Sequence, residues 1–544
     1  MDAKRAHAEL GKNPANHVPL SPVTFLERSA TIWPNRVAVR HGRLAYTYRE
    51  FEARCRRLAS ALAGRGVGRG DTVAVMAANT PALLEAHYAV PALGAVLNAL
   101  NTRLDARSIA FCLDHGEARV LITDPEFAPS IRTALDATQR ELLVVDIDDA
   151  EGPGGEYLGK LTYEAFLREG DADFAWAGPL DEWDSLSLLY TSGTTGDPKG
   201  VVYHHRGAYL NALGNALAFR LDADSVYLWT LPMFHCNGWT YTWAVTAAGG
   251  THVCLRRVEP ARIFAAIREH RVTHMCGAPI VLNMLVHAPD DVKVRFDHRV
   301  DVATGGAAPP SAVIESMAAM GFHVTHLYGL TESYGPATLC AWQNDWDALP
   351  AAERAQRMAR QGVAMPTLAN LQVGNSETAA ALPRDGSTLG EVMLRGNTIM
   401  KGYFRNPAAT AAAFADGWYR TGDLAVWHPD NYIEIKDRLK DIIITGGENV
   451  SSLEIEECLY RHPQIMEAAV VARAHPRWGE TPCAFVTLKS GAAEIGASDI
   501  IAWCRAHLAH FKVPTTVVFG SLPKTVTGKI QKYLLRERAR DLVD

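Results

Sequence analysis

A ten-residue segment, Thr191-Ser-Gly-Thr-Thr-Gly-Asp-Pro-Lys-Gly200, concentrates groups that suit phosphate. Backbone N–H groups beside glycine, hydroxyls and an ammonium can all meet the oxygens of a polyphosphate. The residues that would supply them are Thr191, Ser192, Gly193, Thr194, Thr195 and Lys199. A Gly/Thr turn without a ligand would explain an isolated Ser-Gly-Thr, but the density over the whole segment favours a triphosphate.

The segment is not a Walker A loop. That motif places Ser or Thr after its lysine and continues into a helix, whereas Gly200 follows Lys199 here and the next residues, Val201 to Tyr203, have a strand pattern. Leu186 to Tyr190 is an apolar run that predicts a strand entering the loop. We therefore expect a strand–loop–strand arrangement.

The segment that begins at Tyr190 resembles the signature of the adenylate-forming superfamily, which contains acyl-CoA synthetases, adenylation domains of peptide synthetases and firefly luciferase. Five further segments resemble motifs of the same superfamily, in its order. They are Gly305-Gly-Ala-Ala-Pro309, Tyr328-Gly-Leu-Thr-Glu-Ser333, Gly417-Trp-Tyr-Arg-Thr-Gly-Asp423, Asp437-Arg-Leu-Lys-Asp441 and Pro523-Lys-Thr-Val-Thr-Gly-Lys529. The resemblance covers nearly the whole chain and is closest to the acyl-CoA synthetase branch, including short- and medium-chain and 3-methylthiopropanoate–CoA ligases.

The resemblance implies an ATP site. Tyr328 would lie against adenine, with Gly305, Gly306 and Ala307 on the other face of the ring. Asp423 would accept the ribose hydroxyls, although a turn or helix cap is an equally ordinary use of aspartate. Arg438 would meet ribose and phosphate, or form a surface salt bridge. Thr331 would contact the α-phosphate, and Glu332 with Thr191 would hold Mg²⁺, a hard cation that prefers oxygen ligands.

The same resemblance implies the catalytic groups. Lys529 would place an ammonium where negative charge grows as pyrophosphate leaves. His235, in Pro232-Met-Phe-His-Cys-Asn-Gly-Trp239, would line the carboxylate end of the acyl pocket and act as a gate between adenylate and thiol. Without the resemblance, His235 would be interpreted as a core residue and Lys529 as a solvated surface lysine.

The acyl pocket is expected to be short. Trp239, Gly329 and Tyr334 are its expected walls, together with Cys276 and Ala337, and an indole near the carboxylate occupies room that a long tail would need. By analogy the substrate is a small or medium-chain acid, such as 3-methylthiopropanoate, or an aryl acid.

Coenzyme A would pass Gly446 and Gly447, and Arg256 or Arg257 would meet its phosphates unless they are simply solvated. The resemblance also implies that the C-terminal domain turns between two active arrangements. Its pivot would be Lys440, at a position where relatives often have Asp.

The elements that must position these residues form an α/β fold. From about residue 37 to 302, β-rich runs alternate with helical stretches such as Tyr48 to Gly64, which predicts mostly parallel sheets covered on both faces by helices. After residue 441 the pattern changes to helix, strand, strand, helix, strand, helix, which predicts a small α+β domain. We expect a large domain over 1–438, a hinge over 439–441 and a mobile domain with the catalytic lysine over 442–544.

Composition narrows the class of protein further. The chain has 544 residues, 48% of them hydrophobic, and a formal net charge of −6, which disfavours nucleic-acid binding. Nine scattered cysteines without a zinc-like spacing indicate reduced thiols. Neither a leader, a membrane span nor a C-terminal peroxisomal address is evident, so the chain is expected in the cytoplasm, and a homodimer is compatible with the sequence.

These observations predict an AMP-forming acyl-CoA synthetase that uses ATP, Mg²⁺ and coenzyme A. Two alternatives stay open at this stage: an adenylating enzyme with another acceptor, such as an amine, a carrier protein or oxygen, and a non-catalytic ATP-binding protein on the same fold.

Overall fold

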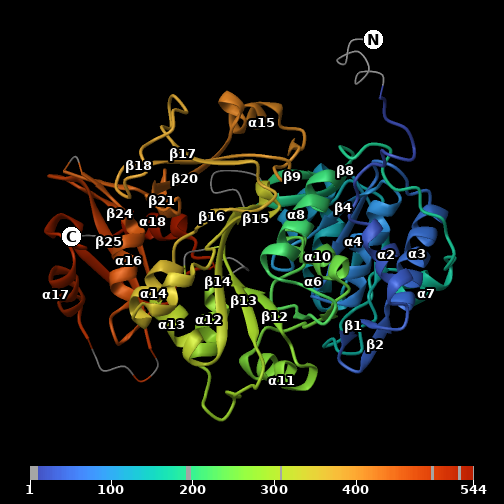
Figure 1. Ribbon diagram of the computed structural model, residues 1–544, viewed down its shortest axis with the longest axis horizontal. Coiled ribbons are helices and arrows are strands. Elements are labelled where there is room, and N and C mark those ends of the chain that lie inside the picture. The colour runs from blue at the N-terminus through green and yellow to red at the C-terminus, as the bar shows by residue number, and fades with distance from the viewer. Residues whose placement is uncertain are drawn as a thin grey trace.

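The structure is a computed structural model that describes residues 10–191, 198–306, 309–446, 448–489, 491, 495–524 and 529–542. Two large sheets and a small third sheet build the N-terminal part, and a fourth sheet builds a smaller C-terminal domain. In Figure 1 the blue N-terminal helices and the red C-terminal domain lie at opposite ends of the long axis.

The first large sheet carries the loop of the Gly/Thr-rich segment. The six neighbouring strands from β8 to β7 in the spatial order are parallel, while β9 and β19 add antiparallel pairs at one edge. In spatial order the strands are β19 (Gly402–Tyr403), β9 (Lys199–His204), β8 (Ser185–Thr191), β4 (Val96–Ala99), β3 (Thr72–Met76), β5 (Ala118–Thr123), β6 (Leu143–Asp146) and β7 (Leu161–Thr162).

In the second large sheet the neighbouring strands from β14 to β1 in the spatial order are parallel, and antiparallel strands lie at both edges. Its order is β16 (Val363–Ala364), β15 (Gly335–Leu339), β14 (Phe322–Leu330), β13 (Val300–Thr304), β12 (His274–Gly277), β10 (Val226–Leu228), β11 (Thr251–Val253), β1 (Val37–His41) and β2 (Leu44–Thr47).

The two smaller sheets are mainly antiparallel. The third has the order β17 (Asn370–Gly374), β18 (Leu389–Arg395), β20 (Tyr419–Trp427) and β21 (Ile433–Arg438). The C-terminal sheet has the order β23 (Glu448–Val450), β22 (Ile443–Thr445), β25 (Gly479–Leu488) and β24 (Ile465–His475), with β26 (Thr516–Phe519) beside β25.

Helices cover both faces of the large sheets, as the sequence predicts. They are α2 (Thr24–Ile32), α3 (Tyr48–Gly64), α4 (Pro81–Ala92), α5 (Ala106–His115), α6 (Ala128–Ala137), α7 (Tyr163–Arg168), α8 (His205–Ala218), α9 (Cys236–Trp239), α10 (Tyr241–Ala248), α11 (Pro260–His270), α12 (Pro279–Val286), α13 (Ser311–Ala319) and α14 (Ala351–Met358). α15 (Pro407–Ala413) contacts β19 and β20, whereas α16 (Ser452–Tyr460), α17 (Ala497–His507) and α18 (Lys532–Arg540) pack on the strands of the C-terminal sheet. Short 3₁₀ turns are η1 (Pro125–Phe127), η2 (Thr331–Ser333), η3 (Asn344–Ala348), η4 (Ala415–Gly417) and η5 (His510–Lys512).

Local sequence explains why α3 forms where it does. Thr47 and Glu50 make a capping box, in which the Thr47 N–H donates to the Glu50 carboxylate at 2.7 Å and the Glu50 N–H donates to the Thr47 hydroxyl at 3.3 Å. Phe51, Cys55 and Leu58 follow at helical spacing and are fully buried. The apolar stripe therefore fixes which face of α3 enters the core.

One core joins the two large sheets. Buried residues of β1 and β10 from one sheet and of β3 and β8 from the other pack with α2, α3, α4, α8 and α10. A second cluster under α11, α12 and α13 covers the outer face of the nine-stranded sheet, and a third includes α5 and α6 on the eight-stranded sheet. Among the residues described, no helix has both the length and the apolar character that a membrane crossing requires.

Candidate active site

Several predicted nucleotide residues lie at the carboxyl ends of parallel strands, where open α/β sheets bind ligands. β8 ends at Thr191, β13 is followed by Gly305 and Gly306, and β14 carries Tyr328 and leads into η2 with Glu332. The strand–loop–strand prediction is confirmed, because β8 and β9 pair antiparallel on either side of the loop. Ser192, Gly193, Thr194, Thr195, Ala307 and Gly447 lie outside the described residues.

Asp423, Arg438 and Tyr328 meet in one cluster. Asp423 in β20 and Arg438 in β21 are register partners in the third sheet, so strand pairing itself brings them together. The Asp423 carboxylate accepts from the Tyr328 hydroxyl at 2.7 Å and lies 3.3 Å from the Arg438 Nε. Asp423 lies inside a strand, which excludes the helix-cap interpretation, and Arg438 pairs inward rather than at the surface.

Gly305 and Gly306 directly follow β13, and the backbone favours glycine at both positions. A Cβ on Gly305 would lie 2.6 Å from the Leu327 carbonyl oxygen and 3.1 Å from the Trp239 ring, so only glycine fits there. Gly306 has φ +83°, a conformation that side chains rarely adopt.

Glu332 lies beside Tyr403 of β19 and beside Met400, which precedes that strand. Its Oε1 accepts from the Tyr403 hydroxyl at 2.8 Å, and its backbone carbonyl accepts from the Met400 N–H at 2.7 Å. Burial raises the pKa of Glu332, while the Tyr403 hydrogen bond opposes that shift. The adjacent Thr331 carbonyl accepts from the Tyr203 hydroxyl at 2.5 Å, which fixes the turn that carries Glu332.

The donor set at this point fits a magnesium ion. Mg²⁺ in nucleotide sites is usually held by one or two carboxylates together with substrate phosphates, and Glu332 supplies such a carboxylate. The Thr191 hydroxyl donates to the Lys199 carbonyl at 3.4 Å across the mouth of the Gly/Thr-rich loop.

Lys529 is near enough to His235 to influence its protonation electrostatically. Burial lowers the pKa of Lys529 to about 8, and the neighbouring Arg438 lowers it further while Asp423 opposes the shift. Burial and the Lys529 ammonium lower the pKa of His235 to about 4. At neutral pH the site therefore pairs a charged lysine with an uncharged imidazole. A small cavity beside His235 is lined by residues that include Tyr190, Phe234 and Thr331.

Trp239 closes one side of the space near Gly305. Its indole is 5% exposed, and a Cβ on Gly335 would lie 3.0 Å from its Cα, Cβ and Cδ1 atoms. The indole is therefore held between Gly305 and Gly335.

The other expected pocket walls have structural contacts as well. Tyr334 is fully buried, stacks on Tyr203 with ring centroids 3.9 Å apart and accepts from the His204 N–H at 2.7 Å. A Cβ on Gly329 would lie 1.7 Å from the Gly335 carbonyl oxygen, so this glycine is required by the β14–β15 pairing.

The residues expected to contact coenzyme A differ in their exposure and in their contacts. Gly446 occupies the turn between β22 and β23 with φ +59°, and its N–H donates to the Trp478 carbonyl at 2.9 Å. Arg256 is only 5% exposed and binds Asp124 and Asp149 at 2.7 and 2.6 Å, so internal carboxylates already occupy it. Arg257 is about half exposed.

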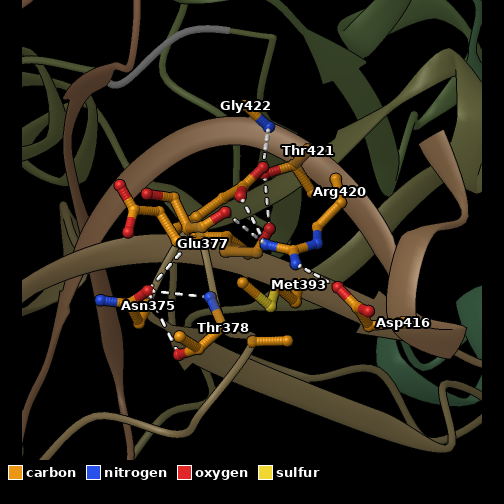
Figure 2. A network of polar contacts seen from close by, with 12 residues as sticks. Asn375, Glu377, Thr378, Met393, Asp416, Arg420, Thr421 and Gly422 are labelled. Atoms are coloured by element: carbon orange, nitrogen blue, oxygen red, sulfur yellow. Dashed lines mark hydrogen bonds and ion pairs between the residues drawn. The ribbon is translucent and has the colours of Figure 1, made fainter. Parts of the chain in front are cut away.

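Sequence reasoning missed a polar network behind Asp423. Figure 2 shows Arg420 directed toward Asp416, with Thr421 and Gly422 next along the chain. Glu391 accepts from Arg420 at 3.1 Å through one oxygen and from the Gly422 N–H at 2.9 Å through the other. Arg420 lies in the motif Gly417–Asp423, whereas Glu391 lies outside every motif and far from Arg420 in the sequence.

Comparison with known proteins identifies the family of the chain. The model of the AMP-binding enzyme family matches residues 26–404, and that of the AMP-binding enzyme C-terminal domain matches residues 454–529. The chain is 50% identical to an acetate–CoA ligase of Humulus lupulus, with 98% of this chain and 97% of the relative covered. It is 49% identical to a peroxisomal acetate/butyrate–CoA ligase of Arabidopsis thaliana (98% and 97% covered) and 46% identical to a peroxisomal benzoate–CoA ligase of the same plant (97% and 95%).

Solved structures agree with this assignment. The chain resembles ATP-bound MatB from Rhodopseudomonas palustris, with a TM-score of 0.82, 27% identity and 95% and 99% of the two chains covered. It also resembles an o-succinylbenzoate–CoA synthetase of Bacillus subtilis in complex with its acyl-adenylate, with a TM-score of 0.79, 25% identity and 96% and 98% covered. The fold is that of an adenylate-forming enzyme. The chain belongs to the AMP-binding enzyme family, in its acyl-CoA ligase branch.

The comparison contradicts the predicted cytoplasmic location, because both Arabidopsis relatives are named peroxisomal. The prediction rested on reduced cysteines and on the absence of an evident address. Cysteine usage separates oxidising from reducing surroundings, and it cannot distinguish one reducing compartment from another.

Proposed function

We propose that this protein converts a small carboxylic acid, ATP and coenzyme A into the acyl-CoA thioester, AMP and pyrophosphate. The observation that carries the proposal is the convergence of Lys529 and His235 with the cluster of Asp423, Arg438 and Tyr328 at the strand ends. Relatives that match almost the whole chain are named CoA ligases, which favours coenzyme A over another acceptor.

In the first step the substrate carboxylate would attack the α-phosphorus of ATP, and the bond to pyrophosphate would break. Asp423 and Tyr328 would position the nucleoside, and Arg438 would contact ribose and phosphate. The Lys529 ammonium would stabilise charge on the α-phosphate and the attacking oxygen, a role typically worth ~3–4 kcal/mol. Glu332 with Thr191 would hold Mg²⁺, which when bound neutralises phosphate charge.

In the second step the thiol sulfur would attack the acyl carbon, AMP would leave, and the thiol proton would pass to solvent. With a pKa of about 4, His235 is a poor base for a thiol at neutral pH. Its uncharged ring suits a gate that lines the acyl carboxyl group. Gly446 and Gly447 would lie along the thiol path.

The substrate is proposed to be of acetate to butyrate size, or a compact acid such as 3-methylthiopropanoate or benzoate. Trp239 supports this choice, because its indole is wedged between Gly305 and Gly335. We also propose that residues 439–441 form the hinge between a domain over 1–438 and a mobile domain over 442–544. A homodimer stays a prediction that light scattering can check.

A panel of acids tests the function. Acetate, butyrate, benzoate, 3-methylthiopropanoate and a long fatty acid are each incubated with ATP and Mg²⁺, and AMP release is measured with and without coenzyme A. The proposal expects acid-dependent AMP release that coenzyme A accelerates, with the long fatty acid poorest. AMP release that coenzyme A leaves unchanged would favour another acceptor, and ADP formation would reject adenylation.

A further inference from the structure

We propose that Tyr403 is a positioning residue that holds Glu332 for the metal and Lys199 for the nucleotide phosphates at the same time. The inference rests on the proposed function, since it concerns the same ATP site. Tyr403 stands outside the six motifs that identify the superfamily in this chain.

Strand pairing places Tyr403 next to Lys199. Tyr403 in β19 is the register partner of Val201 in β9, and Lys199 lies two residues before Val201. Residues two apart on a strand share a face, and a diagonal neighbour is within reach of long and aromatic side chains. The Lys199 Nζ accordingly lies 4.9 Å from the centre of the Tyr403 ring.

The hydroxyl of the same ring reaches Glu332. It donates to Oε1 at 2.8 Å, and three residues earlier the Met400 N–H donates to the Glu332 carbonyl at 2.7 Å. Residue 332 is therefore fixed by its backbone and by its carboxylate from a single short segment, although 71 positions separate it from Tyr403.

The two contacts have different chemical consequences. A hydrogen bond to a ligating carboxylate orients it, and loss of such a partner typically costs about 10–100-fold in metal affinity. A cation above an aromatic face is held by the ring quadrupole, at about 0.5–1 kcal/mol for exposed pairs. Phenylalanine would remove only the first contact and leucine would remove both, so two substitutions separate them.

Calorimetric binding of ATP at graded Mg²⁺ concentrations tests the inference on the full-length protein. Tyr403→Phe should raise the Mg²⁺ concentration for half-maximal ATP binding about 10-fold, and AMP binding without Mg²⁺ should stay within about twofold of wild type. Tyr403→Leu should show the same Mg²⁺ effect and, in addition, a roughly 2–5-fold loss of ATP affinity that persists without Mg²⁺.

Tyr432→Phe is the matched control. It also removes a tyrosine hydroxyl, which donates to the Ala341 carbonyl at 2.5 Å, but it leaves Glu332 and Lys199 untouched. It should bind ATP with wild-type Mg²⁺ dependence.

Two results would overturn the role of Tyr403. The first is an unchanged Mg²⁺ dependence of ATP binding in Tyr403→Phe. The second is an equal loss of AMP affinity and ATP affinity without Mg²⁺ in Tyr403→Leu, which would indicate a packing role only. A wild-type protein that binds no ATP would overturn the proposed function and this inference together.

Discussion

At the scale of single residues, the charge of Lys529 should control only the first half-reaction. Its pKa of about 8 lies below that of ordinary lysine, so the ammonium is present below pH 8 and is lost as the pH rises through that value. We expect kcat/KM for adenylation to fall above pH 8, up to about tenfold per pH unit. Pyrophosphate release measured from pH 6.5 to 9.5 checks this.

Lys529→Ala supplies the control for that profile. It should reduce adenylation by about 100–1000-fold and remove the fall near pH 8, while transfer from presynthesised acyl-adenylate to coenzyme A keeps most of its rate. Equal losses in both half-reactions would refute this division of labour.

Trp239 should set the chain-length limit. Trp239→Gly opens the space that the indole occupies, and glycine tolerates the φ of +53° found there. Each methylene that fits a pocket is worth about 10–200-fold in discrimination, so the ratio of kcat/KM for hexanoate over acetate should rise at least about 10-fold. Trp239→Phe, which keeps a ring, should change the ratio less. An unchanged ratio would place the acyl tail elsewhere.

At the scale of elements, the pairing of β18 with β20 should support the ribose site. Glu391 in β18 binds both Arg420 and the Gly422 N–H, and Gly422 directly precedes Asp423. Glu391→Gln leaves Arg420 without its buried carboxylate, and hydrogen bonds to charged groups are worth about 1.5–3 kcal/mol. We therefore expect a lower melting temperature and a KM for ATP raised about 10-fold, with kcat changed less.

Glu353→Gln is the corresponding surface control. Its partner Arg357 lies 3.7 Å away in an exposed pair on α14, and such pairs contribute little. If both variants lose the same amount of ATP affinity, the Glu391 network does not position Asp423.

An element that neighbouring residues determine can be predicted from the sequence, whereas an element that depends on pairing with a distant strand is harder to predict. α3 begins at its capping box, and the local pattern predicts it residue by residue. The hairpin of β22 and β23 is absent from the predicted order of C-terminal elements, because three-residue strands around Gly446 carry no periodicity. The remaining C-terminal elements follow the predicted order, and the pairing of β24 with β25 includes polar residues such as Arg473 and Glu480.

In the candidate site too, residues in local motifs were predictable and residues that depend on distant strand pairing were not. Asp423, Arg438 and Tyr328 are predicted because each stands in a motif. The pairing of β20 with β21 brings Asp423 to Arg438, and the Tyr328 hydroxyl reaches Asp423 from β14 of another sheet. Tyr403 and Glu391 were missed because their partners lie 71 and 31 positions away and depend on strand register, which a single sequence does not specify.

At the scale of the whole molecule, a few polar contacts join the small domain to the large one in this arrangement. The Asp437 carboxylate accepts from the Ser452 N–H and hydroxyl at 2.7 and 2.6 Å, where α16 begins. The Ser311 hydroxyl of α13 binds Glu457 of α16 at 2.9 Å. In Figure 1 α13 and α16 lie next to each other at this boundary. Rotation of the small domain would have to exchange these contacts.

The proposed rotation would resolve a geometric conflict. Lys529 must lie over the α-phosphate in the first step, yet the thiol must reach the same acyl carbon in the second. Asp441 pairs with Arg536 of α18, and the Leu439 N–H donates to the Gly422 carbonyl at 3.0 Å. The chain on either side of Lys440 is thus tied to different parts of the molecule, which supports the proposal that this residue is the pivot.

Proline at 440 should therefore trap one arrangement. Proline fixes φ near −65° and resists the backbone rotation that a hinge residue must make. Because the present arrangement places Lys529 beside Arg438 and Asp423, adenylation should survive in Lys440→Pro while thioester formation falls by about 100-fold or more. Lys440→Ala, which leaves the backbone mobile, should keep both half-reactions. Measuring pyrophosphate release and acyl-adenylate consumption separately decides the matter, and near-wild-type rates for both steps in Lys440→Pro would place the hinge elsewhere.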